Sequence, residues 1–294
     1  MSGKEELRDV LQPRSQFISV DGVNLHVADW GGGGPDLLLL HAGGFLGYVY
    51  RMMILKFRAG YHVWAMDLRG QGDSDKPPPQ YYRWEYMFRD VEGVISHLGL
   101  SNFYGIGHSG GGAVMALYAA RYPARVKGLA LIEPVIIPSE PRYNYMDGDS
   151  HPFVERARRR RMVWGSRQEL FASYRTKEAF ASWQEEVLWD YVNHGTYELP
   201  DGRVALKCPA EIEAQLFANS RSLDIFSEIP KVQCPVLVLR GEKTGEPLYQ
   251  VSEKVAAQLP GGQLVTVPDT GHFLPMEKPA EVAEIILQFF RESG

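Results

Sequence analysis

A serine between glycines is the first feature of this sequence that could do chemistry. Residues 107–111 read Gly-His-Ser-Gly-Gly and fit the pattern G-x-S-x-G around Ser109. The residues before the motif predict a strand and those after it a helix rich in alanine and glycine. A tight turn between such elements lifts a serine hydroxyl above a sheet, where it can act as a nucleophile. The N–H of Gly110, at the start of the helix, is a candidate donor to a developing oxyanion.

His272 is the histidine best placed to serve as a general base for this serine. It lies in the run Pro-Asp-Thr-Gly-His-Phe, directly after the last expected strand. Loops at the carboxyl ends of strands are where open α/β sheets place groups that face a ligand. The chain has eight histidines, but no other has such a position downstream of Ser109. The alternative for the Ser109 motif is a plain glycine turn, and the alternative for His272 is a packed loop histidine.

A second glycine-rich loop, His41-Ala-Gly-Gly44, follows the apolar run Leu37–Leu40. Backbone N–H groups there, unhindered by side chains, are candidates for the other half of an oxyanion hole. Gly43 is the preferred donor and Gly44 the alternative. His41 is expected to support this loop by hydrogen bonds, and a flexible glycine loop without a role is the remaining interpretation.

The elements that must position these residues alternate between strands and helices. This alternation predicts a parallel sheet with helices on both faces, an α/β fold. Short apolar runs predict strands over 15–20, 23–30, 37–41, 61–67, 102–107, 126–134, 235–241 and 263–268. Helical spacing of apolar residues predicts helices over 81–98, 110–122, 248–259 and 279–291.

The alternation stops at residue 138 and resumes only after residue 228. Between them the sequence is charged and helical, with no convincing buried strand and many aromatic residues. We therefore expect a core formed by 1–137 and 229–294, interrupted by a helical cap over 138–228. The arginine-rich run at 156–161 is expected to be a solvated helix face, with recognition of an acid or of another subunit as the alternative.

Composition limits the classes of function. A net charge of −5 makes nucleic acid an unlikely partner, and 45% hydrophobic residues supply a sizeable core. Two cysteines, Cys208 and Cys234, are too few for a disulfide framework or a cysteine-based metal site, although one bridge between them stays open. The polar N-terminal decapeptide lacks the apolar core of a signal peptide, and no apolar run is long enough to span a bilayer. We expect a cytoplasmic location, a small-molecule substrate and no bound metal; the oligomeric state is open.

Successive segments of the chain resemble the landmarks of the α/β-hydrolase superfamily, in the same order. These segments are LLLLHAGG, AMDLRGQGDSD, GHSGGG, LALIEP and VPDTGHFLPMEKP. The resemblance covers nearly the whole chain and is closest in kind to carboxylesterases and lipases. It implies a mostly parallel, doubly wound sheet of about eight strands, a cap over the active site and no cofactor.

The sequence departs from the superfamily pattern at the third member of the catalytic triad. Relatives carry an aspartate in the loop after the strand PVLVLRG, but Thr244 stands at that position. A hydroxyl cannot stabilise the imidazolium that forms when the histidine takes the serine proton. Glu133, at the end of the strand LALIEP, is the preferred substitute because some superfamily members take their acid from that position. Glu246 is the alternative, and a dyad without an acid also stays open.

Three functions are compatible with these residues. The first is hydrolysis of small or medium carboxylic esters through an acyl-enzyme, with Ser109, His272 and Glu133 as the triad and Gly43 and Gly110 as the oxyanion hole. The second is hydrolysis of carbon–carbon bonds in ring-cleavage products, and the third is a ligand receptor that keeps a slow hydrolase site. Epoxide hydrolases and dehalogenases of the superfamily are disfavoured because they use an aspartate where Ser109 stands.

Overall fold

A single large sheet dominates the fold. The computed structural model describes residues 12–293, and within this range eight strands form one sheet in the order β1-β2-β4-β3-β5-β6-β10-β11. The pairs β1–β2 and β2–β4 are antiparallel, and the remaining five neighbouring pairs are parallel. The strands are β1 (Arg14–Val20), β2 (Val23–Gly31), β3 (Asp36–Leu40), β4 (His62–Met66), β5 (Phe103–His108), β6 (Val126–Ile132), β10 (Val236–Gly241) and β11 (Gly262–Val267).

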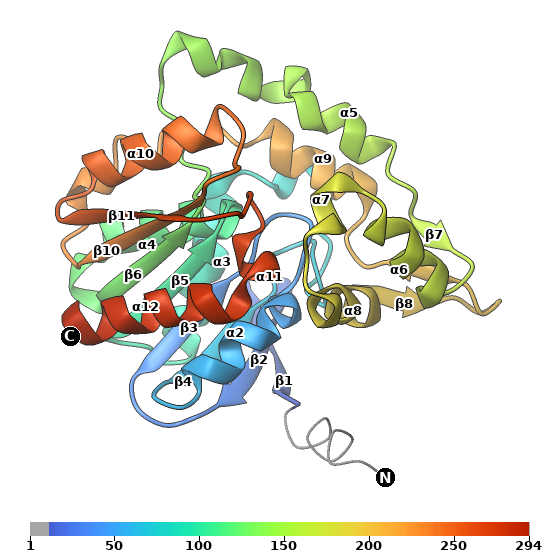
Figure 1. Cartoon of the computed structure of the whole chain (residues 1–294), viewed down its shortest axis with the longest axis horizontal. Helices are drawn as coiled ribbons and strands as arrows, with labels where there is room; N and C mark the ends of the chain where they lie inside the picture. The colour runs from blue at the N-terminus through green and yellow to red at the C-terminus, as the bar shows by residue number, and fades with distance from the viewer. Residues whose placement is uncertain (1–11, 294) are drawn as a thin grey trace.

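Helices cover both faces of this sheet (Figure 1). The four leucines of β3 are fully buried and alternate between the two faces: Leu38 and Leu40 belong to one apolar cluster, and Leu37 and Leu39 to the other. The first cluster includes residues of α3 (Trp84–His97), α4 (Gly110–Arg121) and α10 (Leu248–Gln258). The second includes residues of α2 (Arg51–Phe57) and α12 (Pro279–Ser293). Burial on both faces explains why the strands have continuous apolar runs.

The observed elements confirm the α/β-hydrolase fold expected from the sequence. Every expected strand and helix of the core is present, with ends shifted by no more than a few residues. The helix α2 was not predicted, because seven residues after a short 3-10 turn are too few to show a helical period. The remaining short elements are η1 (Gly47–Tyr50), η2 (Pro79–Tyr81), η3 (Pro123–Arg125), η6 (Ile229–Lys231) and α11 (Leu274–Glu277).

The segment between β6 and β10 lies at one end of the sheet, drawn from green to orange in Figure 1. It contains η4 (Pro141–Met146), η5 (Gly148–Ser150), α5 (Pro152–Arg158), α6 (Arg167–Arg175), α7 (Glu178–Ala181), α8 (Glu185–His194) and α9 (Ala210–Ala218). The expectation of an all-helical segment was wrong in part, because β7 (Val163–Trp164), β8 (Thr196–Glu198) and β9 (Val204–Leu206) form a small antiparallel sheet. Strands of two or three residues are too short to show an alternating pattern.

Three expectations concern a membrane span, a signal peptide and a disulfide. Across residues 12–293, no helix combines the length and the apolar character needed to cross a bilayer. The N-terminal decapeptide, on which the expectation of no signal peptide rests, lies outside the described residues. The two cysteines are free and buried.

Candidate active site

The serine of the G-x-S-x-G motif occupies a strained turn between β5 and α4. Ser109 has φ 55° and ψ −119°, a conformation that side-chain-bearing residues rarely adopt. The turn is tight because both flanking glycines touch backbone: a β-carbon on Gly111 would lie 2.5 Å from the carbonyl oxygen of His41, and one on Gly107 2.6 Å from that of Gly111. Larger residues would therefore push the strand and helix apart. The strain is held by the sheet, since the Ser109 N–H donates to the Ile132 carbonyl at 2.9 Å.

His272 lies in the loop between β11 and α11, and its Nδ1 is 3.3 Å from Oε2 of Glu133. The Glu133 side chain is fully buried and the His272 side chain is 24% exposed. The pair joins loops that are 139 residues apart in sequence. A carboxylate can only accept here, so the proton of a neutral His272 sits on Nδ1 and the Nε2 lone pair is free to take a proton.

Two hydrogen bonds fix the carboxylate of Glu133, and one of them comes from Thr244. Its Oε1 accepts from the Gly241 N–H and from the Thr244 hydroxyl, both at 2.7 Å. Thr244, which stands where the resemblance led us to expect an aspartate, thus holds the Glu133 carboxylate beside His272. Glu133 itself has φ 45°, and its N–H donates to the Leu239 carbonyl at 2.8 Å. The alternative acid, Glu246, is exposed.

The two glycines of the 41–44 loop differ in what their amides do. The Gly44 N–H donates to Oε1 of the buried Gln71 at 2.6 Å and is therefore occupied. Among the described residues, the Gly43 amide has no hydrogen-bond partner. Gly110 is the first residue of α4, so its N–H has no acceptor within the helix. Of the three glycines considered from the sequence, Gly43 and Gly110 thus have amides without a hydrogen-bond partner within residues 12–293, whereas the amide of Gly44 is occupied.

His41 supports the 41–44 loop through hydrogen bonds of its side chain. It is fully buried, its Nδ1 donates to the Ala42 carbonyl at 2.8 Å, and its Nε2 accepts from the Leu68 N–H at 2.9 Å. Burial lowers the pKa of His41, in keeping with a neutral ring that makes one donated and one accepted bond.

A buried hydrogen-bond chain connects the three loops of the site. The Ala42 N–H donates to the Tyr50 hydroxyl at 3.0 Å, and that hydroxyl lies 2.7 Å from Nδ1 of His108. The other ring nitrogen of His108, Nε2, lies 2.9 Å from the carbonyl oxygen of His272. Because a carbonyl only accepts, His108 carries its proton on Nε2 and accepts from Tyr50 on Nδ1. Burial holds the pKa of His108 well below its usual value, so the ring stays neutral. Nothing in the local sequence around Tyr50 indicates this contact.

Aromatic side chains from the core and from segment 138–228 meet next to His272. The rings of Phe45 and Phe273 are 5.5 Å apart, and Phe273 lies 5.2 Å from the His272 ring. Trp183 and Tyr191, from the other side, lie 5.4 and 5.2 Å from Phe45. Segment 138–228 therefore covers the loops that carry Gly43 and His272 with an apolar wall.

The arginine-rich run is only partly the solvated face expected from the sequence. Arg156, Arg158, Arg159 and Arg161 are exposed, but the side chain of Arg160 is 16% exposed and lies 2.6 Å from the Glu213 carboxylate. The expectation was wrong for Arg160 because this residue follows the end of α5 and turns inward toward α9, which a helical period does not show.

Within residues 12–293, the side chains with the spacing of metal ligands do not include Glu133 or His272. Across the described part of the chain, His26, Asp67 and Asp73 form the one group with suitable spacing. Asp67 already accepts from His26 Nδ1 at 2.9 Å and from the Gly47 N–H at 2.7 Å, and Asp73 is paired with Lys207 at 2.6 Å. These contacts give the group a structural explanation in the turn after β4.

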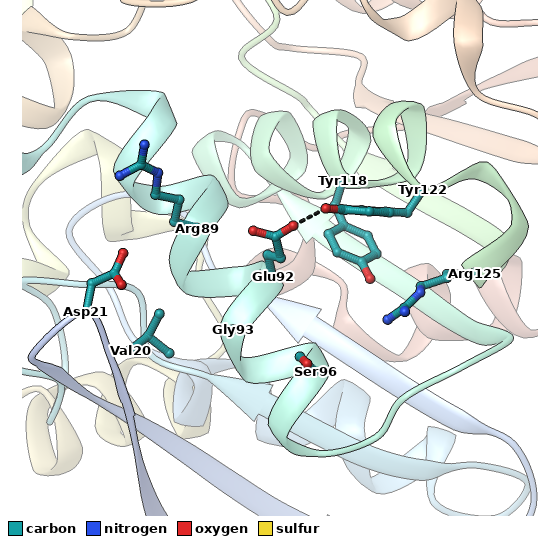
Figure 2. A pocket seen from close by; sticks show the side chains of 9 residues that line it. All are labelled: Val20, Asp21, Arg89, Glu92, Gly93, Ser96, Tyr118, Tyr122 and Arg125. Carbon is teal, nitrogen blue, oxygen red and sulfur yellow. Dashed lines mark hydrogen bonds between the residues drawn. The ribbon is translucent and has the colours of Figure 1, made fainter.

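A groove of about 500 Å³ lies between α3, the end of α4 and the β1–β2 turn (Figure 2). Arg89 and Arg125 lie at its two sides, and Glu92 accepts a hydrogen bond from the Tyr122 hydroxyl. Its lining contains Ser96 but no histidine, so the lining residues offer no nucleophile with a base. The candidate site therefore stays with Ser109, Glu133 and His272, in the loops that follow the parallel strands, rather than in this groove.

Comparison with known proteins places these observations in a family. Epoxide hydrolase 2 of Siraitia grosvenorii is 37% identical over 134 residues, which span 45% of this chain and 42% of that protein, so the chain spans less than half of that relative. The bifunctional esterase/perhydrolase DCH of Acinetobacter calcoaceticus is 25% identical over 92% of this chain and 97% of that protein. The solved structure of E-2-(acetamidomethylene)succinate hydrolase has a TM-score of 0.79 at 21% identity and covers 95% of this chain and 99% of its own. The model of the alpha/beta hydrolase family matches residues 37–285, and the chain belongs to that family.

Proposed function

We propose that this protein hydrolyses carboxylic esters through an acyl-enzyme formed on Ser109. The observation that carries the proposal is the strained Ser109 at the start of α4 together with His272, whose Nδ1 faces a buried carboxylate. In this arrangement His272 takes the serine proton on Nε2 as the hydroxyl attacks the carbonyl carbon. It then gives that proton to the departing alkoxide, and the reverse sequence with water releases the acid.

Glu133 has the role of the third member of the triad in this proposal. Its charge stabilises the imidazolium that forms on proton transfer, and its position keeps the Nδ1–H tautomer of His272. The two donors on Oε1, from Gly241 and Thr244, keep Oε2 turned toward the ring. A threonine in place of the more common aspartate is therefore compatible with an intact triad.

The oxyanion of the tetrahedral intermediate is assigned to the amides of Gly43 and Gly110. Both amides are available, and the positive end of the α4 dipole adds to the field at Gly110. The segment 138–228 is assigned the role of a cap, because its aromatic residues cover the loops that carry Gly43 and His272.

The similarity to epoxide hydrolases does not extend to their chemistry in this proposal. Attack of a serine hydroxyl on an epoxide carbon would leave an alkyl ether on Ser109, which has no carbonyl for water to attack. An aspartate nucleophile leaves an ester instead, and esters are hydrolysed. Serine at position 109 therefore favours acyl transfer, in line with the esterase named among the relatives.

Turnover of 4-nitrophenyl esters of short acids tests the proposal. We expect multiple turnovers by the native protein and a loss on the order of 10³ or more in kcat for Ser109→Ala. Slow single turnover with retained product would favour a receptor that keeps a hydrolase site. No ester turnover, with activity on a ring-cleavage product, would favour a carbon–carbon hydrolase; equal turnover by Ser109→Ala would overturn the assignment.

A further inference from the structure

Helix α9 brings a charged pair to the oxyanion loop. The Glu213 carboxylate on α9 lies 2.6 Å from Arg160, and both side chains are only 16% exposed. A β-carbon on Gly44 would lie 3.0 Å from Oε1 of Glu213 and 3.8 Å from Nη1 of Arg160. Leu216, one turn further along α9, lies 3.7 Å from the corresponding position on Gly43. The pair therefore lies directly over the loop that supplies an oxyanion donor.

Buried hydrogen-bond donors without acceptors gather around the same loop. Within residues 12–293, the buried donors Arg160 Nε, Gln71 Nε2 and Trp183 Nε1 have no hydrogen-bond partner. The buried Oε2 of Glu213 also has no hydrogen bond, although it forms an ion pair with Arg160 at 2.6 Å. Gln71 is the residue that holds the Gly44 amide, Arg160 lies against Gly44, and Trp183 packs on Phe45. A buried donor without an acceptor is unfavourable, so these three donors favour a ligand that brings an acceptor to the loop.

The charge on Glu213 has to be neutralised if the neighbouring loop is to bind an oxyanion. A carboxylate next to an oxyanion hole opposes the negative charge that develops on the substrate, and Arg160 neutralises it. Burial raises the pKa of the Glu213 carboxyl, while Arg160 acts against that shift. Nη1 of Arg160 faces Glu213 and Nη2 donates to the Cys208 carbonyl at 2.8 Å, so a second anion would bind Nε, or would take the place of Glu213 on Nη1 once Glu213 is protonated.

We propose that Arg160, with Gln71 and Trp183, binds a carboxylate on the part of the ester substrate that does not react. This inference rests on the proposed function and names its substrate class: esters whose acyl chain ends in a free acid. A carboxylate supplies two acceptor oxygens and the charge that a guanidinium prefers, whereas a neutral carbonyl supplies one acceptor and no charge. Arg160 is thus a specificity-determining residue.

A pair of matched esters tests this proposal. Monomethyl adipate and methyl hexanoate both have six-carbon acyl chains, and only the first carries a terminal carboxylate. We expect the native protein to hydrolyse monomethyl adipate with a kcat/KM at least about tenfold higher, the effect of one or more hydrogen bonds to a charged group. Acid release is followed at constant pH for both esters.

Variants separate charge recognition from a structural role of the pair. Arg160→Met combined with Glu213→Gln should abolish the preference for monomethyl adipate. Arg160→Met alone should also abolish it and should lower turnover of methyl hexanoate as well, because the Glu213 charge is then left uncompensated next to the oxyanion loop. Glu213→Gln alone should increase the preference, because it leaves the guanidinium without its partner. Arg159→Gln is the matched control in the same run: its side chain is 78% exposed and pairs with Glu155, so the preference should not change.

A binding measurement keeps this proposal distinct from the proposed function. Monomethyl adipate should raise the melting temperature of Ser109→Ala more than methyl hexanoate does, and this difference should vanish when Arg160→Met is added. Turnover of methyl hexanoate with no preference for the acid, or a preference that survives in both Arg160 variants, would overturn the carboxylate site and leave the esterase standing. Absence of turnover with an Arg160-dependent thermal shift would overturn the esterase and support the site.

Discussion

The strand ends of the sheet and the segment over them are built in different ways. At the strand ends, each functional side chain is fixed by backbone: Ser109 and Glu133 have positive φ values, and glycines allow the loops to touch. In segment 138–228, Arg160 and Glu213 form an ion pair, and Arg160 also donates to the carbonyl of Cys208, 48 residues away. The comparison teaches that the proposed reacting groups depend on rigid local geometry, whereas the proposed substrate-binding groups depend on tertiary contacts that can change without disturbing the sheet.

The largest loss of kcat is expected from replacing His272, the proposed base. His272→Ala should lower kcat on the order of 10³ or more, like Ser109→Ala, because the serine then has no group to take its proton. The double variant should be little worse than either single variant, since the two residues act as one unit. Steady-state kinetics of the three variants check this, and losses that multiply in the double variant would argue against a Ser–His pair.

The next largest loss of kcat is expected from replacing Glu133, the proposed acid. Glu133→Gln should lower kcat by about 10²–10⁴, because the amide keeps the shape but removes the charge and can hold His272 in the wrong tautomer. Glu246→Gln, at an exposed position, should cost less than about tenfold. The opposite ranking would move the acid to Glu246. Two mild losses would indicate a dyad.

A smaller effect is expected from the hydrogen-bond chain that connects the loops. Tyr50→Phe removes the acceptor for the Ala42 N–H and the donor to His108, so the 41–44 and 270–273 loops lose a common support. We expect kcat to fall roughly 10- to 100-fold with little change in KM, as for a misplaced reacting group. A change in KM with kcat unchanged, or no change in either constant, would show that this hydrogen-bond chain does not position the reacting groups.

The smallest effect is expected at a ring contact between segment 138–228 and the core. The ring of His194 on α8 stacks on Tyr48 of the core at 3.4 Å, and burial together with Lys207 and Arg51 lowers its pKa to about 4. The unfolded chain, with a histidine pKa near 6.5, therefore takes up a proton first as the pH falls, and stability from this contact is lost between about pH 6.5 and 4.

Removal of this histidine should therefore flatten the pH dependence of stability. In His194→Gln, the melting temperature should fall less on acidification over that range, by roughly 2–4 °C. His97→Gln, at an exposed position on α3, is the matched control. Thermal unfolding at several pH values measures both, and identical slopes in the native and His194 proteins would contradict the assignment.

The sequence predicted the sheet and the loops at the strand ends because their signals are local. Apolar runs mark buried strands, and glycines mark the turns around Ser109 and in the 41–44 loop. The choice between Gly43 and Gly44 needed the structure, since it depends on a hydrogen bond from Gly44 to Gln71, 27 residues away.

Contacts between distant segments could not be predicted in the same way. Thr244 and Glu133 are 111 residues apart, and neither residue alone indicates that the hydroxyl supports the carboxylate. Arg160 was expected on a solvated face because it belongs to a run of arginines. Its four arginine neighbours in the run are exposed, but its own environment depends on where α9 packs. Buried polar contacts of this kind have no periodic signature, so sequence patterns alone do not reveal them.

The most direct test of the central claim is the site of covalent labelling by a fluorophosphonate. If Ser109 is a nucleophile activated by His272, mass spectrometry of the digested protein should find a single adduct on the peptide that contains Ser109. Labelling should be lost in Ser109→Ala and strongly slowed in His272→Ala, which retains the hydroxyl but not the base. An adduct on another residue, or labelling and ester turnover that persist in Ser109→Ala, would contradict the account.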